Sequence, residues 1–414
     1  MSVLPHLHSA AWVVPVSAAP IARGAVAVYA GTIKDIGPLD LLQSRYPGAA
    51  ITTHGEKALT PALINAHTHL ELSHLGELAT TPHQGSFTAW VSQLIELRAR
   101  LGASGAAVEQ SAAAVCLHQY SDGVSVLADI GNTDVALALT SSFPGRLLAF
   151  HEYLGMTERS LAKNRERLML EPDTRLCSGH APYSSHPALL SALKRRAKRL
   201  DQVFPIHTAE PLAELEMLRH GQGEMVDFIH ARTGENIAFQ AAIGPDEGSI
   251  HYLYRHGLLD THTLCIHAIH VSDEEMAIMA GTGVKVCLCP GSNRFLGVGS
   301  APVERYLAQG ILPALGTDSL ASNPELSLWR EMRLLAEASG APDPSVIFAM
   351  ATLGGAQALH LDAHLGSLEP GKEADVLAVP LAEPAATPEA LMQALVNRHA
   401  LSPHALQPLS RIDP

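Results

Sequence analysis

Eight apolar runs of strand length recur through the middle of this 414-residue chain. They end near residues 65–69, 128–130, 150–152, 179–180, 206–207, 266–267, 288–290 and 316–318. Segments with a helical pattern lie between them, at residues 87–100, 186–200, 272–280, 303–309 and 324–337. Apolar strands that alternate with helices are typical of a parallel sheet covered on both faces. Eight such units predict an α/β fold with a closed (β/α)8 TIM barrel, whose chemistry lies at the carboxyl ends of the strands.

Short β-like runs also occur near both ends of the chain, outside the predicted barrel. They lie at residues 11–16, 24–29 and 32–36, and a strand-and-turn pattern returns at residues 366–377. We therefore predict a small composite β-sandwich from residues 1–60 and 366–414, and a barrel from residues 61–365.

Residues 218–247 are rich in glycine and polar side chains, and we interpret them as a long insertion after the fifth strand. Long loops often form lids or substrate walls, although a plain surface excursion fits this composition equally well. The sequence contains no internal repeat and no low-complexity tract.

The composition is that of an ordinary folded protein, with 47% hydrophobic and 17% charged residues. Lys and Arg number 28 against 41 Asp and Glu, and the formal charge of −13 disfavours binding to nucleic acid or to an anionic membrane. No apolar stretch reaches the length of a membrane span, and the N-terminal segment lacks the pattern of a secretion signal. We therefore expect a cytoplasmic protein.

The five cysteines, four of them in predicted buried strands, fit a reducing cytoplasm. Cys287 and Cys289 share one face of a strand, which is the spacing of a thiolate pair. Because no second pair accompanies them, we interpret them as small core residues instead.

Four polar residues at the predicted strand ends suit a metal ion. His67 and His69 point to the same face of a strand, because alternate residues do so. His207 ends the fifth run and Asp318 ends the eighth. Three imidazoles and one carboxylate can hold a catalytic zinc with one position left for water, whose pKa then falls from about 15.7 toward 7. A single H-x-H pair among 23 histidines is weak evidence, but its position at a strand end strengthens it.

Three residues near these ligands predict acid–base chemistry. Glu210 lies three positions after His207 and can carry a proton from water to a ring nitrogen. Asp318 can accept the proton of the water, and His267 is placed to hydrogen-bond that water or the developing negative charge. Hydrolytic removal of an exocyclic amine requires these roles. The alternatives are a solvated first helical turn for Glu210 and a packed imidazole for His267.

The motifs that carry these residues resemble those of the amidohydrolase superfamily. They are N-A-H-T-H at 65–69, G-H-A-P-Y-S at 179–184, H-T-A-E at 207–210, H-A-I-H at 267–270, C-P-G-S-N at 289–293 and G-T-D-S at 316–319. The branch they resemble contains cytosine, guanine and S-adenosylhomocysteine/methylthioadenosine deaminases and triazine chlorohydrolases. The resemblance spans nearly the whole chain and implies a mononuclear zinc site on a (β/α)8 barrel with a composite β-sandwich.

The fourth strand end distinguishes one metal from two. Binuclear relatives in this superfamily carry a carbamylated lysine there, which bridges two ions. Here residues 177–180 read C-S-G-H, without a lysine. We therefore expect one ion per subunit, zinc, with iron(II) as the alternative.

The resemblance also suggests how a substrate is held. In purine-nucleoside deaminases of this branch the histidine of H-A-P-Y contacts substrate, and here it is His180. The carboxylate of Glu71, two residues after the second ligand, is similar to that of aminodeoxyfutalosine deaminases and implies a contact with ribose hydroxyls. The alternative is that Glu71 orients a metal ligand or caps a loop. The glutamate that precedes the S-F-x-x-W segment in the adenosylhomocysteine enzymes is absent from residues 83–90. Arg294, after the seventh strand, is our candidate cation for a benzoate.

We therefore expect a zinc-dependent aminohydrolase that removes the 6-amino group of a purine nucleoside, with aminodeoxyfutalosine of menaquinone biosynthesis as the leading substrate. The alternatives are an S-adenosylhomocysteine/methylthioadenosine deaminase, a triazine-type hydrolase, or a catalytically silent barrel that serves as a scaffold. The expected partner is a small heterocycle or nucleoside, with no nucleic acid and no membrane. A homodimer is compatible with the sequence, which does not fix the oligomeric state.

Overall fold

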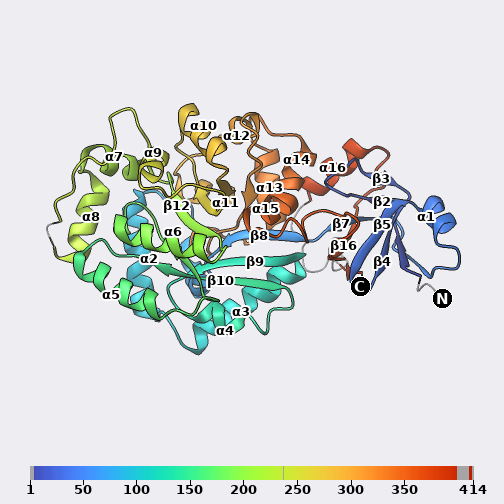
Figure 1. Ribbon diagram of the computed structural model, residues 1–414, viewed down its shortest axis with the longest axis horizontal. Helices are drawn as coiled ribbons and strands as arrows, with labels where there is room; N and C mark the ends of the chain where they lie inside the picture. The colour runs from blue at the N-terminus through green and yellow to red at the C-terminus, as the bar shows by residue number, and fades with distance from the viewer. Residues whose placement is uncertain (1–3, 236, 399–409, 413–414) are drawn as a thin grey trace. The chain divides into compact units, whose positions relative to one another are not determined.

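The computed structural model describes residues 4–235, 237–398 and 410–412 (Figure 1). By their internal contacts these residues fall into two compact units. One comprises Met1–Asn65, Leu117–Val126 and Ser327–Pro414, and the other comprises Ala66–Cys116 and Leu127–Leu326. The division cuts through the strands at residues 63–68 and 124–131, and the predicted boundaries at residues 60 and 365 stay a prediction.

Eight strands occupy the positions of the eight apolar runs. They are β8 (Leu63–Thr68), β9 (Val124–Gly131), β10 (Arg146–Tyr153), β11 (Leu176–Gly179), β12 (Phe204–Thr208), β13 (Thr263–His267), β14 (Lys285–Leu288) and β15 (Ala314–Leu315). They form two four-stranded sheets, in the orders β11-β10-β9-β8 and β12-β13-β14-β15.

Backbone contacts connect the two sheets at both edges. The amide of His207 on β12 donates to the carbonyl of His180 after β11 at 2.9 Å. On the other side, Thr68 of β8 forms a parallel bridge with Asp318, just after β15. The predicted (β/α)8 barrel is therefore confirmed, and its strand ends bring together the residues that follow β8, β12, β13 and β15.

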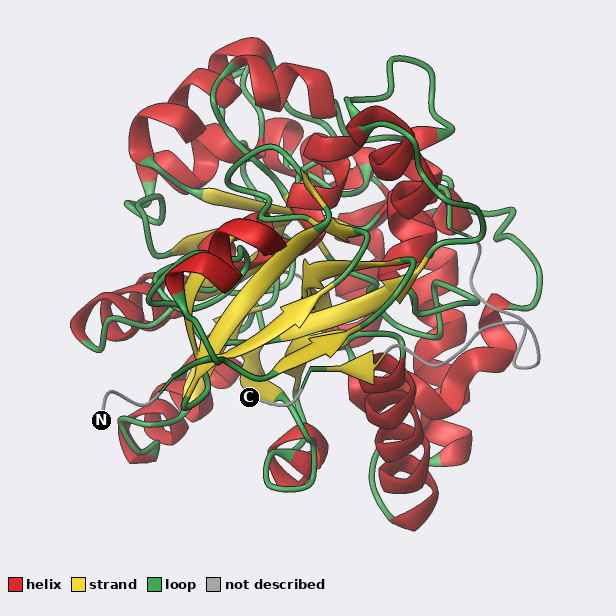
Figure 2. Cartoon of the chain, turned by 90° about the vertical axis from the view of Figure 1, so that its right-hand side faces the viewer, coloured by secondary structure: helices red, strands yellow, loops and turns green. Residues whose placement is uncertain are grey.

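The terminal segments form two further sheets, whose strands are yellow in Figure 2. Their strands are β1 (His6–Ser9), β2 (Trp12–Val13), β3 (Ile21–Ala22), β4 (Gly24–Tyr29), β5 (Thr32–Pro38), β6 (Ile51–Thr53), β7 (Lys57–Pro61), β16 (Val376–Pro380) and β17 (Ser410–Arg411). The sheet orders are β5-β4-β1-β6 and β17-β16-β7-β2-β3. Val26 of β4, Leu59 of β7 and Val376 of β16 belong to one buried cluster, so the two sheets share a core drawn from both ends of the chain.

Helices fill the connections between the strands. They are α1 (Leu39–Arg45), α2 (Phe87–Leu101), α3 (Ala106–Ser121), α4 (Val135–Leu139), α5 (Glu158–Leu170), α6 (Pro187–Arg199), α7 (Leu212–His220), α8 (Glu224–Thr233), α9 (Ser249–Arg255), α10 (Asp273–Thr282), α11 (Pro290–Leu296), α12 (Val303–Ala308), α13 (Leu328–Ala336), α14 (Pro344–Ala349), α15 (Gly355–Ala358) and α16 (Pro388–Val396). A 3-10 segment covers Leu70–Ala79 and a π segment covers Met350–Gly354. In the part of the chain that the structure describes, none of these helices is long and apolar enough to cross a membrane.

Side-chain caps begin the predicted helices α2, α6 and α10. Ser272 accepts from the amide of Glu275 and the Glu275 side chain bonds back, a capping box that starts α10. The helix expected at residues 324–337 instead begins at Leu328, because Ser327 is still extended.

The insertion at residues 218–247 is more ordered than we expected. It contains α8, whose residues Met225 and Ile229 are buried. Gly221 and Gly234, which make the segment look like a loop, adopt the left-handed conformation that ends α7 and α8. The glycines in this segment therefore delimit a helix.

Candidate metal centre and active site

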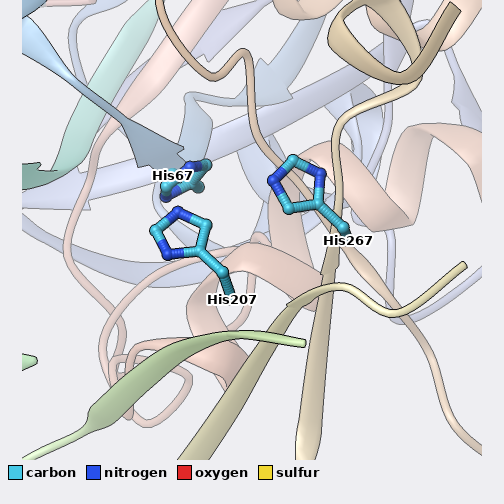
Figure 3. Close-up of side chains that lie close together, drawn as sticks. All are labelled: His67, His207 and His267. Atoms are coloured by element: carbon cyan, nitrogen blue, oxygen red, sulfur yellow. The ribbon is translucent and has the colours of Figure 1, made fainter. Parts of the chain in front are cut away.

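The fold brings the four predicted metal ligands together, and we call them the ligand cluster. Nε2 of His67 and Nε2 of His69 each lie 3.5 Å from Oδ1 of Asp318. The ring centre of His207 lies 5.0 Å from that of His67 and 5.3 Å from that of His69. Figure 3 shows His67 and His207 side by side with His267 next to them. These donors come from β8, β12 and the end of β15, as the sequence predicts for a barrel.

Backbone carbonyls set the orientation of two of the imidazoles. His69 donates from Nδ1 to the carbonyl of Ile130 at 2.6 Å, and His207 donates from Nδ1 to the carbonyl of His180 at 2.9 Å. A carbonyl can only accept, so Nδ1 carries the proton and Nε2 keeps its lone pair for an ion. Burial lowers the pKa of His67 to about 4 and that of His207 well below its usual value, which keeps both rings neutral. Neutral imidazoles are what a metal requires.

Asp318 is held as a carboxylate. Burial opposes its ionisation, but His67, His69 and His267 outweigh that cost and hold its pKa well below the usual range. Its Oδ2 accepts hydrogen bonds from the hydroxyls of Ser292 at 2.5 Å and Ser322 at 3.1 Å, while Oδ1 faces the imidazoles. Three imidazole nitrogens and one carboxylate oxygen fit a divalent transition metal.

Glu210 and His267, the residues predicted to carry out acid–base chemistry, lie next to each other beside the ligand cluster. A carboxylate oxygen of Glu210 is 3.6 Å from Nε2 of His267, and the Nδ1 of His267 donates to Oδ1 of Asn293 at 2.9 Å. Burial, and then the charge of Asp318, raises the pKa of Glu210 well above its usual value. A carboxyl group whose pKa is raised by burial keeps its proton to higher pH and is suited to act as a general acid.

The backbone around these side chains is strained. Ala209, His267 and Asp318 have φ angles of 52°, 68° and 59°, in the left-handed region that non-glycine residues rarely adopt. Gly316 has a different constraint, because a Cβ there would lie 2.7 Å from Cβ of His67. The strand ends are therefore shaped to aim these side chains at one point.

A cavity of about 430 Å³ opens onto the ligand cluster. One end is lined by His69, His180, His207, Glu210, His267 and Asp318. Further out, α2 contributes Phe87, Trp90, Val91, Leu94 and Ile95, and α8 contributes Met225, Phe228, Ile229, Arg232 and Thr233. We call this outer part the distal cleft. The α8 residues follow helical spacing on one face, and the volume is that of a typical small-molecule site.

Of the three residues predicted to contact substrate, His180 and Glu71 line the cavity and Arg294 does not. His180 lines the cavity, its ring centre 5.0 Å from that of His207, and burial lowers its pKa to about 3. Glu71 lines the cavity too, but Oε1 accepts from Arg98 at 2.9 Å and Oε2 from the amide of Thr133 at 2.8 Å. Arg294 is exposed and is not among the residues that line this cavity.

Several cavity residues had no predicted role. Glu152 ends β10 and is buried, and Arg98 on α2 and Arg232 on α8 are the arginines that line the cavity. Glu152 ends the third apolar run, so its position was visible in the sequence but no partner suggested a function. The face of α8 could have been recognised from the spacing of Met225, Phe228 and Ile229.

Comparison with known proteins places this geometry in a family. Residues 58–398 match the profile of the amidohydrolase family. A 5-methylthioadenosine/S-adenosylhomocysteine deaminase of Moorella thermoacetica is 28% identical over 391 residues, which cover 90% of this chain and 85% of that one. The crystal structure of Helicobacter pylori aminofutalosine deaminase in complex with methylthio-coformycin is similar, with a TM-score of 0.81 and 25% identity over 98% of this chain and 97% of that chain. The crystal structure of an adenosine deaminase of Xanthomonas campestris with bound zinc is also similar, with a TM-score of 0.71 and 25% identity. The match covers 92% of this chain and 85% of that chain.

Proposed function

This chain belongs to the amidohydrolase family and is a hydrolase acting on carbon–nitrogen bonds, and from that premise we propose that it removes the 6-amino group of a purine nucleoside. The observation that carries the proposal is the buried carboxyl group of Glu210, raised in pKa and 3.6 Å from His267. Loss of an exocyclic amine from an aromatic ring needs such an acid, because the ring nitrogen must be protonated before water attacks. The deaminases among the relatives support the same reaction class.

The ligand cluster holds one divalent ion in this proposal, and we propose zinc, with iron(II) as the alternative. Three imidazole nitrogens and one carboxylate oxygen suit zinc, and the zinc in a similar adenosine deaminase supports the choice. When bound, the ion supplies a Lewis acid that lowers the pKa of water at the site.

The protein residues then divide the proton transfers. Glu210 donates its proton to the ring nitrogen beside the carbon that bears the amine, and it is reprotonated by the hydroxyl added from water when the amine departs and the ring carbonyl forms. Asp318, which stays ionised, accepts the proton of the attacking water and passes it to the departing amine. His267 accepts a hydrogen bond from the same water through Nε2, because its Nδ1 already donates to Asn293. His180 contacts the heterocycle from the cavity wall.

Within this class we propose aminodeoxyfutalosine as the substrate, a nucleoside that carries a benzoate. The distal cleft offers an aromatic and aliphatic surface, including Phe87, Trp90 and Phe228, that suits the benzoate ring. Arg232 lies on the last turn of α8 and lines the same cleft, so it can pair with the carboxylate. Because Arg294 lies outside the cavity, Arg232 takes its place in the proposal.

An S-adenosylhomocysteine or methylthioadenosine deaminase is the second candidate. Relatives with that name match most of the chain, and a thioether would also fit the apolar distal cleft. Against it, residues 83–90 lack the acidic residue expected before S-F-x-x-W. The silent-scaffold alternative loses support, because all four ligand positions are filled and converge. The five cysteines are all free and buried, which supports the proposal of a cytoplasmic enzyme.

A substrate panel tests the proposal. The zinc-loaded protein is given aminodeoxyfutalosine, S-adenosylhomocysteine, methylthioadenosine, adenosine and an aminotriazine, and ammonia release is followed. We expect the highest kcat/KM for aminodeoxyfutalosine and detectable turnover of the other nucleosides. Turnover of the triazine with none of the nucleosides would contradict the proposed function, and a preference for the thioether nucleosides would favour the second candidate.

A further inference from the structure

We propose that Glu152, at the end of β10, is the carboxylate that binds the two neighbouring ribose hydroxyls of the substrate. This inference rests on the proposed function, because it requires a nucleoside. It assigns to Glu152 the role that the sequence suggested for Glu71.

Glu71 is already committed to other partners. Arg98 of α2 donates to Oε1 at 2.9 Å and also to the side chain of Asn132 at 2.9 Å. The amide of Thr133 donates to Oε2 at 2.8 Å. A Cβ added at Gly131 would lie 3.2 Å from the Glu71 carboxyl carbon, so the backbone packs closely against it. Glu71 therefore ties α2 to the segment after β9, and both oxygens would have to exchange these bonds to reach a ligand.

Glu152, unlike Glu71, has a carboxyl oxygen that lacks a hydrogen-bond donor among the described residues. It lines the cavity and is only 6% exposed, and none of the described residues donates a hydrogen bond to its Oε1. Nδ1 of His207 lies 3.8 Å from this oxygen but gives its proton to the carbonyl of His180. A buried carboxylate oxygen without a donor is costly, and native proteins seldom leave one unless a ligand completes the site.

The position of Glu152 indicates which part of the substrate it meets. In His207, Nε2 faces the ligand cluster and Nδ1 lies on the far side of the ring. Glu152 is on the Nδ1 side, one imidazole away from the position of the ion. It therefore contacts a part of the substrate removed from the reacting carbon, as the sugar of a purine nucleoside is.

The chemistry of the group favours hydroxyls over a second ion. The two coplanar oxygens of the Glu152 carboxyl group can form hydrogen bonds with two neighbouring hydroxyls. Donor atoms of Glu152, His180 and His207 do lie within 4.8 Å of one another. However, the Nδ1 atoms of both histidines are engaged, with Ser184 and with the His180 carbonyl, and Nε2 of His207 belongs to the ligand cluster. His207 therefore has no free nitrogen with which to bind a second ion beside Glu152.

Deletion of hydroxyls from the substrate, combined with substitution of Glu152, tests the inference. The unaltered enzyme and Glu152→Gln are compared on adenosine, 2′-deoxyadenosine and 3′-deoxyadenosine, with kcat/KM as the readout. We expect loss of a hydroxyl to lower kcat/KM of the unaltered enzyme by about 10- to 100-fold. Glu152→Gln should lose a similar factor on adenosine and little more on the deoxynucleosides, because the same contact is removed only once. Metal content should stay at one ion per chain.

Glu71→Gln is the matched control. It removes a cavity carboxylate that is already paired, so any loss should be equal for adenosine and the deoxynucleosides. If the unaltered enzyme deaminates adenosine and its deoxy forms equally well, Glu152 does not bind the hydroxyls, whether or not the variant folds. The same conclusion follows if Glu152→Gln keeps the full ribose preference, and the proposed function stands in both cases. If no purine nucleoside is deaminated, the proposed function fails, and this inference fails with it.

Discussion

The ligand cluster and the distal cleft belong to one cavity, but strand ends build the first and helices build the second. In the ligand cluster, backbone carbonyls orient His69 and His207, and a serine hydroxyl holds Asp318. In the distal cleft, α2 and α8 offer apolar faces with a single unpaired cation, Arg232, among the described residues. In the proposed function, the reaction therefore depends on the fixed geometry of the ligand cluster, whereas the choice of substrate depends on the helical surface of the distal cleft.

Removal of a metal ligand should have the largest effect. His207→Ala deletes the Nε2 donor, and we expect metal content to fall well below one ion per chain and turnover to fall to background, because the variant loses one of the nitrogen donors of the ligand cluster and leaves a gap in its place. Metal analysis and ammonia release on the same preparation measure both. His118→Ala, an exposed histidine on α3, is the control and should keep both. A His207→Ala protein with full metal and activity would contradict the ligand role.

Loss of the acid should have the next largest effect. Glu210→Gln should keep the metal but lose roughly 10²-fold or more in kcat, the usual scale for a lost general acid. Because Glu210 must be protonated to act and its pKa is raised, activity of the unaltered enzyme should decline as pH rises through that pKa. The variant should lack this decline. Glu216→Gln, exposed on α7, serves as the control, and near-normal deamination by Glu210→Gln would refute the assignment.

The distal cleft should give the smallest effect and the most selective one. Arg232→Met should raise KM about fivefold for a substrate that carries a carboxylate, since Arg232 is exposed and water screens the pair. The KM for methylthioadenosine should not change. Arg294→Met is the matched control and should affect neither, because Arg294 lies outside the cavity. Equal effects of Arg232→Met on both substrates would remove the carboxylate contact from the proposal.

The same division explains what the sequence could predict. The barrel was predictable because strands buried on both faces leave continuous apolar runs, and a residue that ends such a run must lie at the rim. His67, His207 and Asp318 were therefore placed correctly relative to one another by strand order alone. No helical pattern was needed for that part of the site.

Side chains on helices and in loops were less predictable. Arg294 follows a strand, yet α11 turns Phe295 inward and leaves Arg294 exposed, and a single turn of helix decides this. The partners of Glu71 lie 27 and 62 residues away, so its role depends on packing that no local pattern reveals. The glycines near α8 gave its segment the composition of a loop. Sequence alone therefore predicted the positions of residues at strand ends better than those of residues on helices and in loops.

Helix α8 is bounded by Gly223 before it and Gly234 after it, and both have positive φ angles. Glycines at both ends let the chain turn sharply into and out of the helix. The ten residues between them can therefore be exchanged as one segment. Exchange of this segment would change which substrate substituents the distal cleft accepts, while the ligand cluster and its proposed hydrolytic reaction stay the same.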